Sequence, residues 1–131
     1  MVLPPQLRDD LVAHARDGVP NECCGLILGD DETARRVMRC RNVAETPETR
    51  YLLDPRQLFE AYRASDDFDR ELVAVYHSHP RSPAYPSPTD RAEARWPDAL
   101  YVLVSLRWGE PEVYAYRIDD GAVTEVPIVS G

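Results

Sequence analysis

Two histidines and one aspartate stand close together between residues 77 and 90, where the sequence reads HSHPRSPAYPSPTD. Side chains two residues apart on a β-strand point to the same face, so a strand that runs through His77 and His79 presents both imidazoles on one side. Imidazole nitrogens bind zinc at about 2.0–2.1 Å, and Asp90 adds a carboxylate from the first turn of the next expected helix. Three protein ligands with one open position are typical of catalytic zinc, whereas structural zinc has four.

The same residues also have a purely structural explanation. Ser87 is a good N-cap, Pro88 suits the first helical position, and Asp90 is placed to bond back to the backbone as in a capping box. These two uses of Asp90 are compatible, because one carboxylate oxygen can bind a metal while the other accepts a backbone N–H. Histidine pairs with this spacing are common by chance, so the pair alone does not establish a metal site.

The surrounding segments predict helices that interleave with strands, and therefore a mixed sheet with helices on both sides. A helix at 55–67 is expected to bury Leu58, Phe59 and Tyr62, and the apolar strands at 71–77 and 100–106 are expected to be central. The predicted order is a helix at 5–18, strands at 23–29 and 33–43, a helix at 55–67, a strand at 71–77, a short helix starting at 88 and ending before 97, a strand at 100–106, and a hairpin of 112–118 with 122–129.

The composition fits one soluble globular domain over residues 1–131. A formal net charge of −8 argues against nucleic-acid binding, which needs a basic surface. No apolar run approaches the length of a membrane helix, and the N-terminus lacks a signal pattern, so we expect a cytoplasmic protein. The three cysteines, Cys23, Cys24 and Cys40, are odd in number and indicate free, mostly buried thiols.

The spacing of the whole stretch resembles the H-x-H-x7-S-x2-D signature of the JAMM (MPN+) zinc metalloprotease family, with His77, His79, Ser87 and Asp90 at the four motif positions. Upstream, residues 21–29 (NECCGLILG) are similar to the E-C-C-G-L-x-x-G version found in small bacterial members. That family has an α/β/α sandwich fold related to the cytidine deaminases, and the resemblance implies this fold for nearly the whole chain.

The resemblance also implies a role for each matched residue. His77, His79 and Asp90 would bind one Zn²⁺, Glu22 would be the general base, and Ser87 would stabilise the oxyanion. Zinc lowers the pKa of a bound water to about 7, and a carboxylate within reach can carry its proton to the departing amine. The alternative for Glu22 is a solvated carboxylate in a turn.

Family members cleave amide bonds that follow the C-terminus of ubiquitin-fold proteins. The E-C-C-G form favours a sulfur-carrier protein with a Gly-Gly tail as the partner, and cysteine as the leaving group. Two alternatives stay open: an isopeptidase acting on lysine-linked conjugates, and a non-catalytic module that keeps zinc for stability. Arg81 and Tyr85 are candidates for contacting the tail. The alternative is that Arg81 is simply exposed to solvent and that Tyr85 packs within its loop. The oligomeric state stays open, with a homodimer among the alternatives, as does any contact of the thiols with the site.

Overall fold

The structure, a computed structural model, describes every residue from Met1 to Gly131 and contains one six-stranded mixed sheet in the order β2-β1-β3-β4-β5-β6. The β3–β4 pair is parallel and the other neighbouring pairs are antiparallel. The helices are α1 (Pro5–Gly18), α2 (Pro55–Ala64), α3 (Phe68–Glu71) and α4 (Pro88–Glu93). The strands are β1 (Cys24–Asp30), β2 (Thr33–Cys40), β3 (Leu72–His79), β4 (Leu100–Ser105), β5 (Glu112–Asp119) and β6 (Ala122–Val126).

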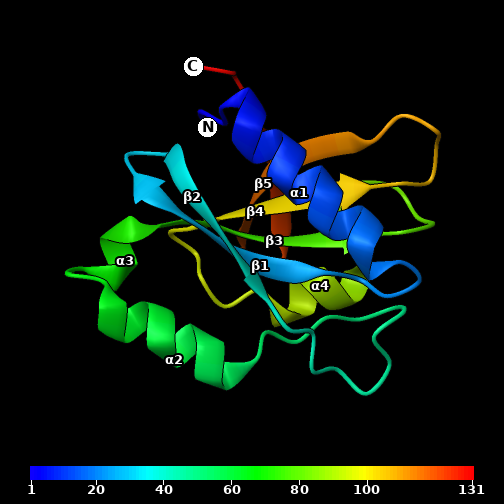
Figure 1. The fold of residues 1–131 in the computed structure, drawn as a ribbon, viewed down its shortest axis with the longest axis horizontal. Coiled ribbons are helices and arrows are strands. Elements are labelled where there is room, and N and C mark those ends of the chain that lie inside the picture. Colours follow the sequence, from blue (N-terminus) through cyan, green and yellow to red (C-terminus); the bar gives the residue numbers. More distant parts are fainter.

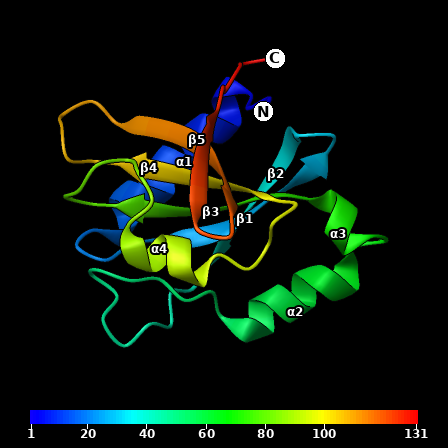
Figure 2. The ribbon, with the colours of Figure 1, turned by 180° about the vertical axis from the view of Figure 1, so that it is seen from behind.

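Helices cover both faces of this sheet. The helix α1 crosses the front of the sheet in Figure 1, and α4 lies in front of it in Figure 2, the view from behind. One core joins Leu11 and Ala15 of α1 to the sheet, and a second core on the opposite face includes Ala61 of α2 and Phe68 of α3. The predicted mixed sheet between helices is confirmed. None of the helices is long and apolar enough to cross a membrane.

The strand β3 lies inside the sheet, between β1 and β4, and all eight of its residues are buried. The strand begins with the apolar run LVAVY. This run is typical of a strand that is covered on both faces, because neither face is exposed to solvent and polar residues do not alternate along it. The strand ends with His77, Ser78 and His79, which are polar and still buried. Buried polar side chains need partners, so this end of β3 is where a functional site is expected.

The glycine of the E-C-C-G segment allows β1, β2 and β3 to approach closely. A Cβ atom on Gly25 would lie 2.3 Å from the Met38 carbonyl oxygen on β2 and 2.5 Å from the Tyr76 ring on β3. Both distances are far below van der Waals contact, so only glycine fits at this position. This packing holds the start of β1 firmly against the strand that carries His77 and His79.

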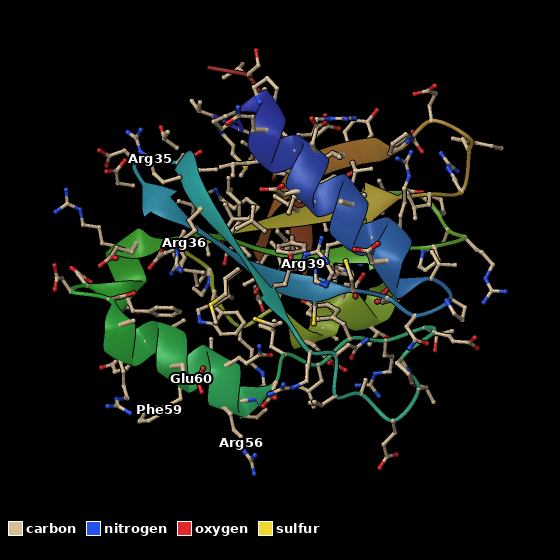
Figure 3. The ribbon with its side chains drawn as sticks, viewed as in Figure 1. Arg35, Arg36, Arg39, Arg56, Phe59 and Glu60 are labelled. Atoms are coloured by element: carbon tan, nitrogen blue, oxygen red, sulfur yellow. The ribbon has the colours of Figure 1, made fainter.

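The helix predicted at 55–67 ends at Ala64, and the separate short helix α3 begins only at Phe68, so this prediction was wrong in its length and in its buried face. Ser65 takes an extended conformation and ends α2, while the Asp67 side chain accepts the N–H of Arg70 and caps α3. Leu58 is half-buried, but Phe59 and Tyr62 are 58% and 61% exposed rather than buried. Figure 3 places Phe59 on the outer side of α2, together with Arg56. A ten-residue helix buries only a narrow stripe, and here the small Ala61 occupies it.

Other strand ends differ from the predictions by a few residues. The strand β2 stops at Cys40 instead of residue 43, because Asn42 leaves the β1–β2 ladder and bridges to Leu53. The predicted D-G hairpin is present between β5 and β6, where Asp120 and Gly121 both have positive φ, 50° and 81°. Two consecutive residues with positive φ are the mark of a type I′ turn.

On the α1 face of the sheet, His14 of α1 and Tyr76 of β3 form a hydrogen-bonded pair, on the side opposite to α2 and α3. The His14 Nδ1 atom lies 2.6 Å from the Tyr76 hydroxyl. Burial, assisted by Arg39 and opposed by Asp17, lowers the pKa of His14 from 6.5 to about 4. His14 is therefore neutral at pH 7, and its Nδ1 accepts the hydrogen bond that Tyr76 donates.

We expect His14 to weaken the fold in mild acid. Between pH 6.5 and about 4 the unfolded chain binds a proton at His14 that the folded chain does not, so the free energy of unfolding contributed by this residue falls as the pH falls. Urea titrations of the wild type and of His14→Gln at several pH values isolate this contribution from the acidic groups that both proteins share. The stability advantage of the wild type should shrink from pH 6.5 to 4, and two parallel profiles would refute this assignment.

Candidate metal centre

The end of β3 and the start of α4 bring two ring nitrogens and one carboxylate oxygen together. The Nε2 atoms of His77 and His79 lie 3.2 Å apart, and each lies 3.1 Å from Oδ2 of Asp90. The two histidine side chains are 1% and 4% exposed, and that of Asp90 is 10% exposed. The strand does continue through His79, as the spacing of the two histidines requires.

The size of this triangle fits a tetrahedral metal ion. Ligand bonds of about 2.0–2.1 Å at tetrahedral angles separate the ligand atoms by about 3.3 Å, close to the observed 3.1–3.2 Å. Two imidazoles and one carboxylate are zinc ligands of the kind found in catalytic sites. The geometry of the side chains therefore fits one zinc ion with three protein ligands.

The protonation of the three groups also suits metal binding. Although burial alone raises it, hydrogen bonds from both rings and from the Ser87 N–H hold the pKa of Asp90 well below its usual range, so the carboxylate is ionised. Burial lowers the pKa of His77 and keeps that ring neutral. For His79 the effect of burial is outweighed by hydrogen bonds with Asp90 and the Pro83 carbonyl, and its pKa is raised. Metal binding at this position would displace the proton that lies between Nε2 of His79 and Asp90.

Each histidine ring is held in a different way. The Nδ1–H of His79 donates to the Pro83 carbonyl oxygen at 2.7 Å, which leaves the Nε2 lone pair free to bind a metal. His77 has no partner at Nδ1, but its ring stacks on Tyr51 with centroids 4.2 Å apart and planes 21° from parallel. Tyr51 was not identified from the sequence, because nothing local to it points to β3.

The capping box is present together with the metal-type geometry. The Ser87 Oγ accepts the Asp90 N–H at 3.0 Å, and Asp90 Oδ2 accepts the Ser87 N–H at 2.9 Å. The expectation that Asp90 would divide the two uses between its two oxygens was wrong: Oδ2 faces both the backbone N–H and the rings. The cap therefore aims the carboxylate at the two histidines, and the Ser87 O–H remains free to donate.

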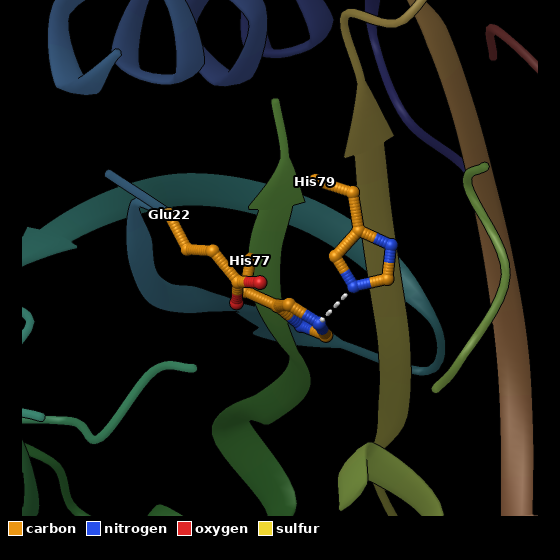
Figure 4. A group of neighbouring side chains, drawn as sticks. All are labelled: Glu22, His77 and His79. Atoms are coloured by element: carbon orange, nitrogen blue, oxygen red, sulfur yellow. Dashed lines mark hydrogen bonds between the residues drawn. The ribbon is translucent and has the colours of Figure 1, made fainter. Parts of the chain in front are cut away.

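Glu22 lies two residues before the start of β1 and points toward the two rings, as Figure 4 shows. Its carboxylate comes within 4.8 Å of the ring nitrogens of His77 and His79, and its Oε1 is buried without any hydrogen-bond partner. Burial, opposed by His79 and reinforced by Asp90, raises the pKa of Glu22 to about 7. A solvated turn carboxylate would show none of these features, and a general base works best with a pKa near the working pH.

The backbone of Glu22 is fixed by a loop that sequence analysis did not single out. Its N–H donates to the Pro47 carbonyl at 2.8 Å, and the Asn42 amide donates to its carbonyl at 2.9 Å. The same amide also donates to the Arg50 carbonyl, so Asn42 ties Glu22 to the 42–50 loop. An asparagine in a polar loop gives no local signal of this role.

The structure does not bring Arg81 and Tyr85 into the cluster of Glu22, His77, His79 and Asp90. Arg81 is exposed, and Tyr85 is half-exposed with its ring edge-on to Tyr116 at 5.5 Å. Both stand on the 80–86 loop, which follows His79 directly. All three cysteines are free and buried, as predicted; Cys23 packs in the α1 core and Cys24 and Cys40 pack in the other.

Two imidazoles and an ionised carboxylate gather at the end of β3 with a buried, partnerless glutamate beside them, and metal-dependent hydrolases use arrangements of this kind. Residues 4–119 match the family model described as prokaryotic homologs of the JAB domain, and the chain belongs to this family. The predicted membership of the JAMM (MPN+) family is thereby confirmed.

The chain is similar to several known proteins over most of its length. It is 43% identical to the CysO-cysteine peptidase of Mycobacterium tuberculosis, over 98% of this chain and 89% of the relative. It is 42% identical to a probable TtuB-protein conjugate cleaving protease of Thermus thermophilus, over 92% of this chain and 78% of the relative.

Solved structures share the fold. Protein DSY2949 from Desulfitobacterium hafniense superposes with a TM-score of 0.86 at 29% identity, covering 98% of this chain and 90% of that protein. The JAB1/MPN domain protein AF2198 from Archaeoglobus fulgidus superposes with a TM-score of 0.64 at 16% identity, covering 98% and 99% of the two chains. The α/β/α sandwich inferred from the signature is the fold of these proteins.

Proposed function

We propose that this chain is a zinc metallopeptidase that hydrolyses the amide bond after the Gly-Gly tail of a ubiquitin-fold sulfur-carrier protein, with cysteine as the leaving group. The observation that carries the proposal is the convergence of His77, His79 and Asp90 within 3.2 Å, beside the partnerless carboxylate of Glu22. The relatives named for CysO-cysteine and TtuB-conjugate cleavage support the substrate class.

His77, His79 and Asp90 would hold the zinc ion. When bound, zinc polarises the scissile carbonyl and makes water a nucleophile near neutral pH. Glu22 accepts a proton from the attacking water at Oε1 and later delivers it to the departing amine, for which a pKa near 7 is well suited. All of these side chains come from one copy of the chain, so residues 1–131 are proposed to act as one catalytic domain.

Ser87 is proposed to stabilise the oxyanion that forms when the carbonyl is attacked. Its Oγ already accepts the Asp90 N–H, which fixes the oxygen beside the metal ligands. The hydroxyl proton is left free to donate to a developing negative charge. A donor that is oriented before the reaction stabilises the transition state without any cost of reorganisation.

The carrier tail has room beside Asp90. A cavity of about 200 Å³ adjoins this residue and is lined by apolar side chains, among them Leu58 and Trp96, and by charged ones, among them Glu93 and Arg95. The glycines of the tail are proposed to pass close to the metal, and the residues before them to lie along this cavity. Arg81 and Tyr85, on the loop that follows His79, are proposed to contact the tail.

Two other functions compete with this proposal. An isopeptidase would use the same centre on a lysine-linked conjugate, and a non-catalytic module would keep the zinc without needing a base. The partnerless Glu22 argues against the second, because structural zinc has no use for a buried carboxylate held outside the ligand triangle. The three buried free thiols support a reducing compartment, and we place the activity in the cytoplasm.

The leaving group can be tested with two substrates that share one carrier protein. One carries a cysteine after its Gly-Gly tail, and the other is joined through the same tail to a lysine side chain. We expect a higher kcat/KM for the cysteine conjugate, measured with the zinc-loaded enzyme by mass spectrometry of the products. Faster cleavage of the lysine-linked conjugate would assign the chain to the isopeptidases instead.

A further inference from the structure

The loop that follows His79 is attached to the sheet through three consecutive carbonyl groups. The Ser105 hydroxyl donates to the Ser82 carbonyl at 2.7 Å, and the His79 ring donates to the Pro83 carbonyl at 2.7 Å. The Tyr116 hydroxyl donates to the Ala84 carbonyl. These donors come from β4, β3 and β5, so one short loop is bonded to three neighbouring strands.

The middle bond of the three acts on a candidate metal ligand. Its donor is Nδ1 of His79, so this bond selects the tautomer in which Nε2 carries the lone pair that faces Asp90 and His77. Partners of this kind orient the ligand ring and raise its affinity for the metal. The position of the Pro83 carbonyl therefore bears directly on the metal centre.

The outer two bonds determine where the Pro83 carbonyl lies. Peptide units are planar, and the proline ring fixes φ of Pro83, so fixing the carbonyls of Ser82 and Ala84 leaves the group between them little freedom. Ser105 is fully buried and is the register partner of His79 in the β3–β4 pair. The same pairing ties the His79 backbone down, because Leu106 N–H donates to the His79 carbonyl at 3.2 Å.

Tyr116 anchors the other end of the same short segment. It is 5% exposed and packs with Ala84 and Leu103 in a small cluster of its own beneath the loop. Burial raises the pKa of Tyr116 to about 12, so its hydroxyl is a donor throughout the neutral range. Its ring also meets Tyr85 edge-on. Tyr116→Phe removes only the hydroxyl. It keeps the packing of the ring in the small cluster and against Tyr85, and it breaks the hydrogen bond to the Ala84 carbonyl.

We propose that Ser105 and Tyr116 are positioning residues of the metal centre, which act by holding the 80–86 loop so that the Pro83 carbonyl orients His79 for metal binding. The hydroxyl groups of both residues bond to the loop, and not to His77, His79 or Asp90. This inference rests on the zinc site of the proposed function and adds two residues from strands β4 and β5, which the H-x-H-x7-S-x2-D signature does not include.

The test is the zinc dissociation constant of purified variants, measured by competition with a chromogenic chelator. We expect the double variant Ser105→Ala, Tyr116→Phe to bind zinc about tenfold more weakly than the wild type, the lower end of the range for partners of metal ligands. The matched control is Tyr76→Phe, which removes a buried hydroxyl on the opposite face of the sheet, where it bonds His14. This control should bind zinc with unchanged affinity.

The outcomes separate this inference from the proposed function. If the wild-type protein binds no zinc, the proposed metal site is wrong, and the proposed function fails with it. A wild type that binds zinc, with a double variant of equal affinity, overturns only the positioning role. If zinc binding in Tyr76→Phe falls as far as in the double variant, general loss of stability explains the effect and the inference fails. Should the double variant not fold, Tyr116→Phe alone decides, and unchanged zinc affinity in it would refute the proposal.

Discussion

The kcat of Glu22→Gln should be lower than that of the wild type by a factor of about 10² to 10⁴, because a positioned general base usually contributes this much to the rate. The amide keeps the size of the side chain and cannot accept the proton of the attacking water. The fold should survive, since Oε1 of Glu22 has no partner in the protein that the change would remove. Zinc content should also stay near one ion per chain, because Glu22 lies outside the triangle of His77, His79 and Asp90.

The matched control for this variant is Glu45→Gln, which makes the same chemical change on an exposed residue of the 41–54 loop. Its kcat should equal that of the wild type. Activity is measured with a carrier protein that carries cysteine after its Gly-Gly tail. Full activity in Glu22→Gln would rule out the base assignment, whereas loss of activity together with loss of zinc would make Glu22 a ligand instead.

His77→Ala should abolish zinc binding and, with it, hydrolysis. The change removes one of three ligands, so the loss of affinity should exceed the roughly 10–100-fold typical of an outer partner of a ligand. It also removes the ring on which Tyr51 stacks, so some loss of stability is expected. Zinc per chain, measured by elemental analysis after dialysis against a weak chelator, should fall from about one to near zero.

The chain supplies its own control for this experiment in its third histidine. His14 lies on the α1 face and is hydrogen-bonded to Tyr76, with no contact to the ligand triangle. His14→Ala should therefore retain one zinc ion and full activity. Retention of zinc by His77→Ala, or its loss from both variants, would contradict the assigned ligands.

The sequence predicts much of this arrangement because the relevant signals are local. Two histidines at a strand spacing share one face once the strand continues to His79, and Ser87, Pro88 and Asp90 specify a helix start by themselves. The central position of β3 follows from its apolar run. Glu22 is 55 residues before His77 and was connected to it only by resemblance to a family signature.

What the sequence did not show depends on contacts between distant segments. The stacking of Tyr51 on His77 and the bonds of Asn42 to Glu22 arise when the 41–54 loop folds across the end of β3. The exposed faces of Phe59 and Tyr62 were wrongly predicted as buried, since a short amphipathic pattern does not tell which of two adjacent stripes meets the sheet. Tertiary packing makes that choice.

X-ray absorption at the zinc edge of the purified protein tests the central claim most directly, because it counts and identifies the atoms around the ion. Two imidazole nitrogens and one carboxylate predict a shell of nitrogen and oxygen at about 2.0–2.1 Å with no sulfur. Cys23 and Cys24 follow Glu22 directly, so a sulfur shell at about 2.3 Å would mean that a thiol binds the metal and that His77, His79 and Asp90 are not the ligand set.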